Sequence, residues 1–249
     1  MISLLASLLG LLAHHTAAHG GAVNYTVDDI WYPGYDTYGP TSQATAPWLP
    51  QRPWISNNPI FETTNTSLSC NVPGTSIPAQ SYIPILPGQS ISAVYYSWVH
   101  TVGPMIVWLT PCGTSCSTLD PSTALWFKIA ERGLLSGDIL EGMWFQRDFV
   151  KWDGSPSLWT EKLPEGLKAG KYLVRHEIVS LHSANRPQFY AECANLEVGG
   201  TGDRVPGEEY LVGIPGVWSM DQPEINIDVY DPVVGNQTTY KIPGPPVWI

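Results

Sequence analysis

Short apolar runs of strand length recur along the chain, and 23 Gly and 23 Pro residues separate them. Such runs, rich in Val, Ile, Tyr, Phe and Trp and bounded by turn residues, are typical of β-strands. No long stretch has the period of an amphipathic helix. The pattern favours an all-β fold, an antiparallel sandwich of the immunoglobulin or fibronectin type. Strands are expected within residues 90–100, 104–110, 171–182, 187–198 and 224–230.

Two further stretches are less regular. Residues 122–133 fit either a strand or a short helix, and residues 31–60, rich in Tyr, Trp, Pro and Gly, predict a long loop. Loops of that length in a compact domain are usually functional. No linker or internal repeat interrupts the chain, so residues 19–249 are expected to form a single domain.

The expected strand within 171–182 carries two histidines, His176 and His182. Both share the parity of Tyr172, Val174, Ile178 and Ser180, and so one face of the strand, opposite Arg175, Glu177 and Leu181. Six residues of strand span roughly 20 Å. At most one of the two histidines is therefore expected to serve any single site.

Residues 1–18 have the features of a secretory signal peptide. The run ISLLASLLGLLA has the length of such a segment's apolar core, and small residues precede the expected cleavage after Ala18. The run is too short to cross a membrane, and no second one follows. The sequence predicts a secreted, extracellular chain that begins at His19 and has no membrane partner.

Charge excludes one class of partner. Charged residues are 14% of the chain and the formal net charge is −10. This balance argues against a nucleic-acid partner and fits a soluble secreted protein, expected to be a monomer.

Cysteines and sequons agree with secretion. Four cysteines, Cys70, Cys112, Cys116 and Cys193, favour two disulfides, for which three connectivities are possible. A local bridge across Gly113-Thr114-Ser115 is easy to form, and the long bridge that remains would close a loop of roughly 120 residues. Acceptor sequons stand at Asn24, Asn65 and Asn236, of which Asn65 and Asn236 are the expected glycosylation sites.

Histidine at a new N-terminus has a special chemistry. Its α-amino group, which titrates near pH 7.7–8.0, and its ring nitrogen can chelate one metal ion together. A third nitrogen from another histidine would complete a T-shaped set, and tetragonal nitrogen ligation suits Cu(II). A chance histidine at this position is the alternative.

Four segments resemble the fungal cellulose-active lytic polysaccharide monooxygenases of auxiliary activity family 9, formerly glycoside hydrolase family 61. They are HGGAVNYTVDDIWYPGYD, LWFKIAERGLL, GKYLVRHEIVSLHSANRPQFYAECANLEVGG and TYKIPGPPVW. The similarity covers essentially all of residues 19–249 in the family's order. It implies a β-sandwich whose long loops form a flat substrate face, with one copper ion per chain.

The resemblance also implies the copper ligands. His19 would give its amine and ring nitrogen, and His100, which precedes Gly103-Pro104, would give the second ring. The family usually has one residue between this histidine and Gly-Pro, whereas this chain has Thr101 and Val102. A one-residue slip turns a strand residue to the other face unless a bulge absorbs it.

The segment PQFY supplies the rest of the implied site. Tyr190 would occupy the axial position at copper, and Gln188 would reach an oxygen species bound nearby. His182 would hydrogen-bond Gln188 or that oxygen species and shuttle a proton. The loop between His182 and Gln188 is about three residues shorter than is usual in the family. His176 is expected to be structural.

By the same resemblance, Cys70 pairs with Cys193 and Cys112 with Cys116, and Tyr32, Tyr35 and Tyr240 are candidates for stacking on sugars. The implied partners are cellulose or another β-1,4-glucan and an electron donor, either a small reductant or a cellobiose dehydrogenase-like enzyme. The implied reaction is oxidative cleavage at C1 or C4 with oxygen or hydrogen peroxide.

Three alternatives stay open. One is a histidine-brace copper protein of the same fold that does not oxidise polysaccharide. Another is a hydrolase, which needs two carboxylates about 5–9.5 Å apart. The adjacent pairs Asp28/Asp29 and Glu208/Glu209 point to opposite sides if they lie on a strand. The third is a carbohydrate-binding sandwich without catalysis.

Overall fold

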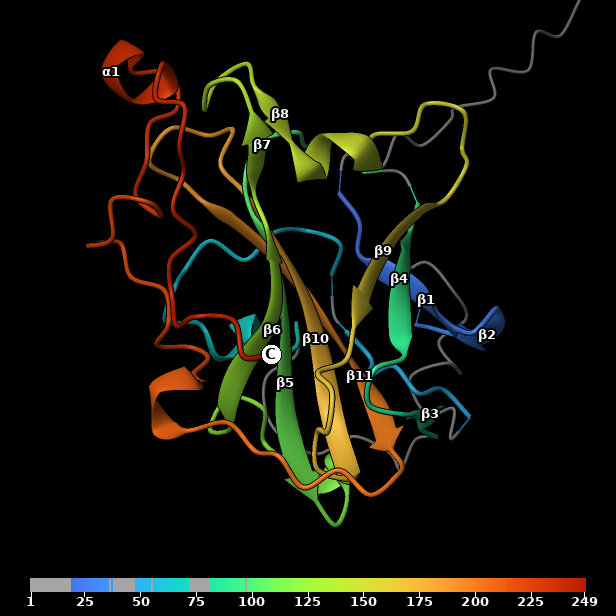
Figure 1. The fold of residues 1–249 in the computed structure, drawn as a ribbon. Helices are drawn as coiled ribbons and strands as arrows, with labels where there is room; N and C mark the ends of the chain where they lie inside the picture. The colour runs from blue at the N-terminus through green and yellow to red at the C-terminus, as the bar shows by residue number, and fades with distance from the viewer. Residues whose placement is uncertain (1–18, 36, 38–47, 55, 72–80, 97) are drawn as a thin grey trace, which may run out of the picture.

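The computed structural model describes residues 19–35, 37, 48–54, 56–71, 81–96 and 98–249, so the expected signal peptide lies outside the described residues. Two β-sheets pack face to face (Figure 1). The smaller sheet has the order β2-β1-β4-β9 and the larger one the order β12-β6-β5-β10-β11-β3. A two-stranded hairpin, β7-β8, stands at the upper end in Figure 1. The predicted β-sandwich is confirmed.

The elements have the following bounds. The strands are β1 Ala22–Val27, β2 Ile30–Pro33, β3 Ile83–Ile85, β4 Ser90–Tyr95, β5 Met105–Gly113, β6 Leu125–Arg132, β7 Leu134–Ser136, β8 Met143–Trp144, β9 Ser157–Lys162, β10 Gly170–Ser180, β11 Gln188–Val198 and β12 Leu211–Gly213. The 3₁₀ turns are η2 Thr66–Leu68, η3 Cys116–Thr118, η4 Phe145–Phe149 and η5 Glu208–Tyr210, and the one short helix among the described residues is α1 Pro232–Gly235.

Strand pairing within the described sheets is antiparallel except at one edge, where β3 runs parallel to β11. The longest ladder joins β10 and β11 from Gly170↔Val198 to Ser180↔Gln188 without a break. These two strands, with β5 beside them, form the rigid centre of the larger sheet. Side chains just beyond their ends are therefore held in fixed relation to one another.

Alternation along β10 sends its residues into two cores, as the sequence predicts. Tyr172, Val174 and Ile178 pack between the sheets, and the ring of His176 lies in the same layer, 5.2 Å from the Trp159 ring. Leu173 and Val179 point to the opposite face, into a second core that the loops and the C-terminal segment cover.

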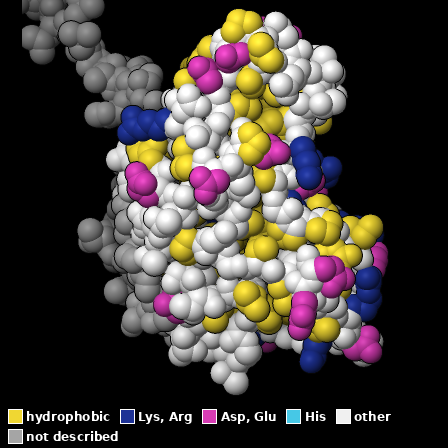
Figure 2. Space-filling view, turned by 90° about the vertical axis from the view of Figure 1, so that its left-hand side faces the viewer, with side chains coloured by type: hydrophobic (Ala, Val, Ile, Leu, Met, Phe, Trp, Pro, Cys, Tyr) yellow, Lys and Arg dark blue, Asp and Glu magenta, His cyan; other side chains and the backbone are white. Residues whose placement is uncertain are grey.

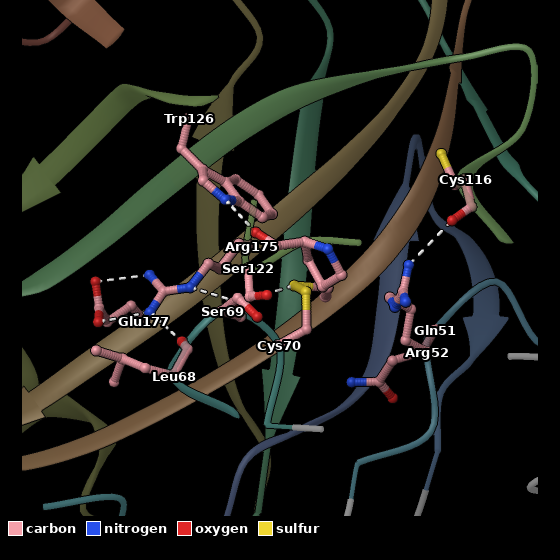
Figure 3. Close-up of a disulfide and its surroundings, with 12 residues drawn as sticks. Gln51, Arg52, Leu68, Ser69, Cys70, Cys116, Ser122, Trp126, Arg175 and Glu177 are labelled. Atoms are coloured by element: carbon pink, nitrogen blue, oxygen red, sulfur yellow. Dashed lines mark hydrogen bonds and ion pairs between the residues drawn. A yellow bond between two sulfur atoms is a disulfide. The ribbon is translucent and has the colours of Figure 1, made fainter. Parts of the chain in front are cut away.

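The second core contains a buried ion pair (Figure 3). The Arg175 guanidinium lies 2.7 Å from the Glu177 carboxylate and donates to the carbonyls of Leu68 and Ser69 at 2.8 Å. Glu177 also accepts hydrogen bonds from the indoles of Trp108 and Trp218, each at 3.0 Å. A buried charge pair is tolerated when its remaining polar atoms are bonded in this way.

Both disulfides that the resemblance implies are present. Cys70 joins Cys193 across 123 residues, and Cys112 joins Cys116 across four. The long bridge ties the η2 segment to β11, and the short one closes the turn after β5. The long bridge holds β11 at Cys193, three residues beyond Tyr190.

Three expectations need correction or resolution. Residues 224–230 are not a strand: Ile225, Ile227 and Val229 are buried alternately, but against the second core and without a ladder partner. Residues 31–60 are not one uninterrupted loop, because β2 takes residues 30–33 and both Gln51 and Ile60 form isolated bridges with β11. Residues 125–132 form β6, which decides for a strand over a helix.

In the view of Figure 2, Asp and Glu side chains are dispersed among hydrophobic and uncharged ones. Within the described part of the chain, no helix is both long and apolar enough to cross a membrane.

Candidate metal centre

Five of the residues singled out in the sequence meet at one end of the sandwich. His19 precedes β1, His100 lies in the connection from β4 to β5, and His182 follows β10. Gln188 and Tyr190 begin β11, beside the end of β10. The β10–β11 turn thus places His182 beside the start of β11. His19 and His100 come to the same end of the sandwich from two other segments, before β1 and after β4.

The rings of His19, His100 and Tyr190 form a triangle. The ring centroids are 5.6 Å apart for His19 and His100, 5.9 Å for His19 and Tyr190, and 5.7 Å for His100 and Tyr190. The Nε2 atom of His100 lies 3.0 Å from the Tyr190 hydroxyl. Two imidazoles and a phenol oxygen therefore converge on one point.

Gln188 lies two residues before Tyr190 on the same face of β11. The Tyr190 hydroxyl donates a 2.8 Å hydrogen bond to Gln188 Oε1, and both side chains are buried. The hydroxyl is thus held between His100 and Gln188. Burial, with the Glu192 carboxyl nearby, raises the pKa of Tyr190 well above its ordinary value, which keeps the phenol protonated.

His182 is half-buried and stacks on His100, with ring centroids 4.3 Å apart. Its Nδ1 lies 2.7 Å from the Ser180 hydroxyl. The sequence analysis expected Gln188 or an oxygen species as the partner of His182. In the structure Ser180 takes one ring nitrogen, while the Gln188 oxygen is bonded to Tyr190.

Burial favours the neutral form of His100 and of His182. Burial lowers the pKa of His100 to about 4, with His182 and His19 adding to the effect. Burial, followed by His19, also lowers the pKa of His182. A metal ligand must be an unprotonated imidazole, so His100 is ready to bind a cation without first losing a proton.

The backbone after His19 is anchored in the core. Buried Glu192 accepts a hydrogen bond from the Ala22 amide at 3.2 Å, and Gln51 donates to the Ala22 carbonyl at 2.6 Å. A Cβ atom at Gly21 would lie 2.5 Å from the Glu192 carboxylate and 2.9 Å from Trp54. A larger residue at position 21, where the chain leads from His19 into β1, would have to displace the Glu192 carboxylate and the Trp54 ring.

The two residues after His100 do not turn the strand over. The Leu181 amide donates to Val102 O and the Val179 amide to Pro104 O, each at 2.9 Å. These bonds continue the β5–β10 register beyond Met105↔Ile178. Gly103, with φ of +130°, lies between these two bonded residues, and His100 keeps its place against Tyr190.

The donors fit copper. Two imidazole rings, a phenol oxygen and the amine that His19 would gain on processing form a nitrogen-rich set of the kind that Cu(II) prefers. No group of three or more His, Cys, Asp or Glu side chains suited to a metal occurs among the described residues. The proposed centre has only two such side chains, His19 and His100. Its other donors are the His19 amine and the Tyr190 phenol, so a cluster of three is not needed.

The three tyrosines proposed to stack on sugars are half-buried. Tyr32 packs against the core, Tyr35 lies against Trp54, and Tyr240 packs on Trp144 and donates to Glu224 O. Asn65 and Asn236, the expected glycosylation sites, are both exposed.

The structure adds aromatic residues that the sequence reasoning missed. Trp98 packs edge-on against both His100 and Tyr190, with centroids 5.2 and 4.9 Å away. Tyr230 donates its hydroxyl to His182 O and leaves 57% of its surface exposed, and Trp152 is 84% exposed. The contacts of Trp98 with Tyr190 and of Tyr230 with His182 join segments far apart in the sequence, so the local pattern gave no signal for them.

Comparison with known proteins agrees with this geometry. The model of Auxiliary Activity family 9 (formerly GH61) matches residues 19–240. AA9 family lytic polysaccharide monooxygenase B from Heterobasidion irregulare is 42% identical over 250 residues, which cover 100% of this chain and 98% of that protein. AA9 family lytic polysaccharide monooxygenase D from Thermothelomyces thermophilus is 38% identical over 248 residues, covering 96% and 92%.

Solved structures are similar over the same length. The crystal structure of HiLPMO9B aligns with a TM-score of 0.84 and 40% identity, covering 92% of this chain and 99% of that one. The crystal structure of a cellulose-active polysaccharide monooxygenase from M. thermophila aligns with a TM-score of 0.82 and 36% identity, with the same coverage. The chain therefore belongs to auxiliary activity family 9, the copper-dependent oxidoreductases that act on polysaccharide as lytic monooxygenases.

Proposed function

We propose that this protein cleaves β-1,4-glucan, cellulose first, by hydroxylating C1 or C4 of a glucose unit. The observation that carries the proposal is the convergence of the His19, His100 and Tyr190 rings within 6 Å of one another. A relative of similar fold and length is described as cellulose-active. Copper supplies the one-electron chemistry with oxygen or hydrogen peroxide, and an external reductant or a dehydrogenase supplies the electrons.

The metal-binding role falls to His19, His100 and Tyr190. His19 gives a ring nitrogen and, once residues 1–18 are removed in secretion, its amine, and the family match that begins at His19 supports this processing. His100 gives its Nε2 atom, and Tyr190 places its hydroxyl beside it. The anchors at Ala22 hold the His19 end of the chain.

Proton and oxygen handling falls to two neighbours. Gln188 holds the Tyr190 hydroxyl and presents an amide beside the metal position. His182, half-buried and neutral, has one ring nitrogen on Ser180 and can pass a proton through the other. These groups would orient an oxygen species held at the metal.

Substrate contact falls to exposed rings near the histidines. Trp152 follows Val150, which bridges to Trp98 beneath His100, and Tyr230 is bonded to the His182 carbonyl. In Figure 1 the loop after η4 and the segment leading into α1 both lie at the upper end of the sandwich. Exposed aromatic rings suit stacking on the faces of sugar rings. The half-buried Tyr32, Tyr35 and Tyr240 have less surface to offer.

The test is a product assay. Processed, copper-loaded protein is incubated with amorphous cellulose, ascorbate and air, and the soluble oligosaccharides are analysed by mass spectrometry. Aldonic acids or C4 ketone/gem-diol products that require both copper and reductant are expected. Native sugars alone would indicate a hydrolase, and oxidised products only from xyloglucan or xylan would correct the substrate.

One observation favours a second candidate, a histidine-brace copper protein of this fold without oxidative activity. His182 is bonded to Ser180 rather than to Gln188, so its proton-transfer geometry departs from the expectation. Stoichiometric copper binding without oxidised products from any of these polysaccharides would select this candidate.

A further inference from the structure

The segment from Trp98 to Pro104 carries His100 and is connected to the 3₁₀ turn η4 at two points. The backbone of Val150, directly after η4, forms an isolated parallel bridge with Trp98. The side chain of Gln146, inside η4, donates from Nε2 to the carbonyls of Gly103 and Val179, each at 3.2 Å. One element thus contacts the His100 segment on both sides of the histidine.

Pro104 explains why Gln146 is needed. Pro104 and Val179 form a hydrogen-bonded pair in the continued β5–β10 register, because the Val179 amide donates to Pro104 O. Proline has no N–H to return the second bond, which would leave Val179 O without its ladder donor. A side-chain amide has two N–H groups, and Gln146 Nε2 gives one of them to Val179 O.

Gln146 is built into this position. Its side chain has no exposed surface, and both carbonyl partners fix which end of the amide faces them. The neighbouring Gly103 leaves no room for adjustment, because a Cβ atom there would lie 2.0 Å from Val179 O. The segment can therefore approach β10 only with glycine at 103 and a donor at 146.

We propose that Gln146 is a positioning residue for the metal centre: its amide replaces the missing Pro104 N–H and joins the segments that carry His100 and His182. Val179 precedes His182 by three residues on β10, and Gly103 follows His100 by three. Without the amide only the backbone bonds from the Val179 and Leu181 amides would join the two segments, and the 4.3 Å stack of His100 on His182 would loosen. The inference rests on His100 being a copper ligand, as proposed above.

The test compares Gln146→Met, which keeps the side chain's length but lacks the amide, with Thr110→Val. Thr110 donates to Leu125 O from the other half of β5, so its replacement removes one buried donor away from the histidines. The readouts are Cu(II) affinity by calorimetry, the Cu(II) spectrum by electron paramagnetic resonance, and Tm. Loss of a group that orients a metal ligand typically weakens binding about 10–100-fold.

We expect Gln146→Met to weaken Cu(II) binding in that range and to shift the spectrum. Thr110→Val should lower Tm and leave both copper readouts at the wild-type values. If both variants lower Tm while neither changes affinity or spectrum, Gln146 is only structural and the inference is wrong. Wild-type protein that fails to bind copper would instead refute the proposed ligand set.

A rescue variant separates positioning from packing. Pro104→Ala restores a backbone N–H opposite Val179 O, so Pro104→Ala/Gln146→Met should recover most of the lost affinity. Equal affinity in the single and double variants would contradict the claim that Gln146 supplies the missing donor. If Gln146→Met does not fold, Gln146→Asn, one methylene shorter, replaces it in both comparisons.

Discussion

The imidazole rings of His100 and His182 stack with their centroids 4.3 Å apart and their planes only 13° from parallel. Two protonated rings at this distance would repel each other, and burial lowers the pKa of both groups. The stack is thus a contact between neutral rings. It connects a proposed metal ligand, His100, to a residue outside the ligand set.

The ligand role of His100 gives the first prediction. His100→Ala removes the Nε2 atom that faces Tyr190 and should abolish stoichiometric Cu(II) binding, measured by calorimetry on processed protein. His176→Phe, which alters a histidine in the core against Trp159, is the control and should bind copper normally. A normal copper spectrum in His100→Ala would rule out this ligand assignment.

Removal of the Tyr190 hydroxyl gives the second prediction. Tyr190→Phe loses the bonds to His100 and Gln188 and should reduce the free energy of unfolding by about 1 kcal/mol, with a changed Cu(II) spectrum. Tyr25→Phe removes another buried hydroxyl, which Gln51 contacts at 3.4 Å. That control should lose stability without any spectral change, and identical spectra in all three proteins would argue against Tyr190 as the axial group.

The third prediction concerns substrate contact. Trp152→Ala removes an aromatic ring that is 84% exposed and should weaken adsorption to insoluble cellulose several-fold, measured by depletion from solution. The Cu(II) spectrum should not change. Leu125→Ala, at the far end of β6 from the metal centre, is the control, and equal adsorption of both variants would place the substrate elsewhere.

The fourth prediction concerns the stability of the folded protein at acid pH. Burial lowers the pKa of His176 to about 3 in the folded protein, from 6.5 when exposed. The unfolded chain therefore binds the proton first, and stability that is present above pH 6.5 is lost as pH falls toward 3. By pH 4.5 this loss amounts to about 2–3 kcal/mol.

Urea unfolding at pH 7 and pH 4.5 measures the effect. His176→Phe cannot take up the proton, so its stability should fall by less between the two pH values than that of the wild type. The neutral histidines near the metal centre contribute equally in both proteins. An identical fall in both would show that the pKa of His176 is not lowered in the folded core.

Much of the fold could be predicted because strand alternation is local. The parity of Tyr172, Val174 and Ile178 determines which core each enters, and the same rule puts Gln188 and Tyr190 on one face of β11. The rule failed at Ile225, Ile227 and Val229, whose alternation reflects packing of a segment of turns against the second core rather than pairing in a sheet.

The candidate site depends on contacts between segments far apart in the sequence. The periodicity of hydrophobic residues carries no information about such contacts. His19, His100 and Tyr190 were joined by the resemblance, not by spacing. Ser180, the last residue of β10, contacts Nδ1 of His182, where the resemblance implied Gln188 or an oxygen species as the partner of that histidine. Gln146 gives no sequence signal at all, because its role follows from a proline 42 positions earlier.

The central claim is that processing creates the metal centre by freeing the amine of His19. The most direct measurement is Cu(II) affinity, by calorimetry, of the chain beginning at His19 against the same chain with one Gly added before it. We predict tight binding at one copper per chain for the processed protein and weakening in the extended one as large as that caused by removing the His19 ring. Equal affinity of the two chains would contradict the claim.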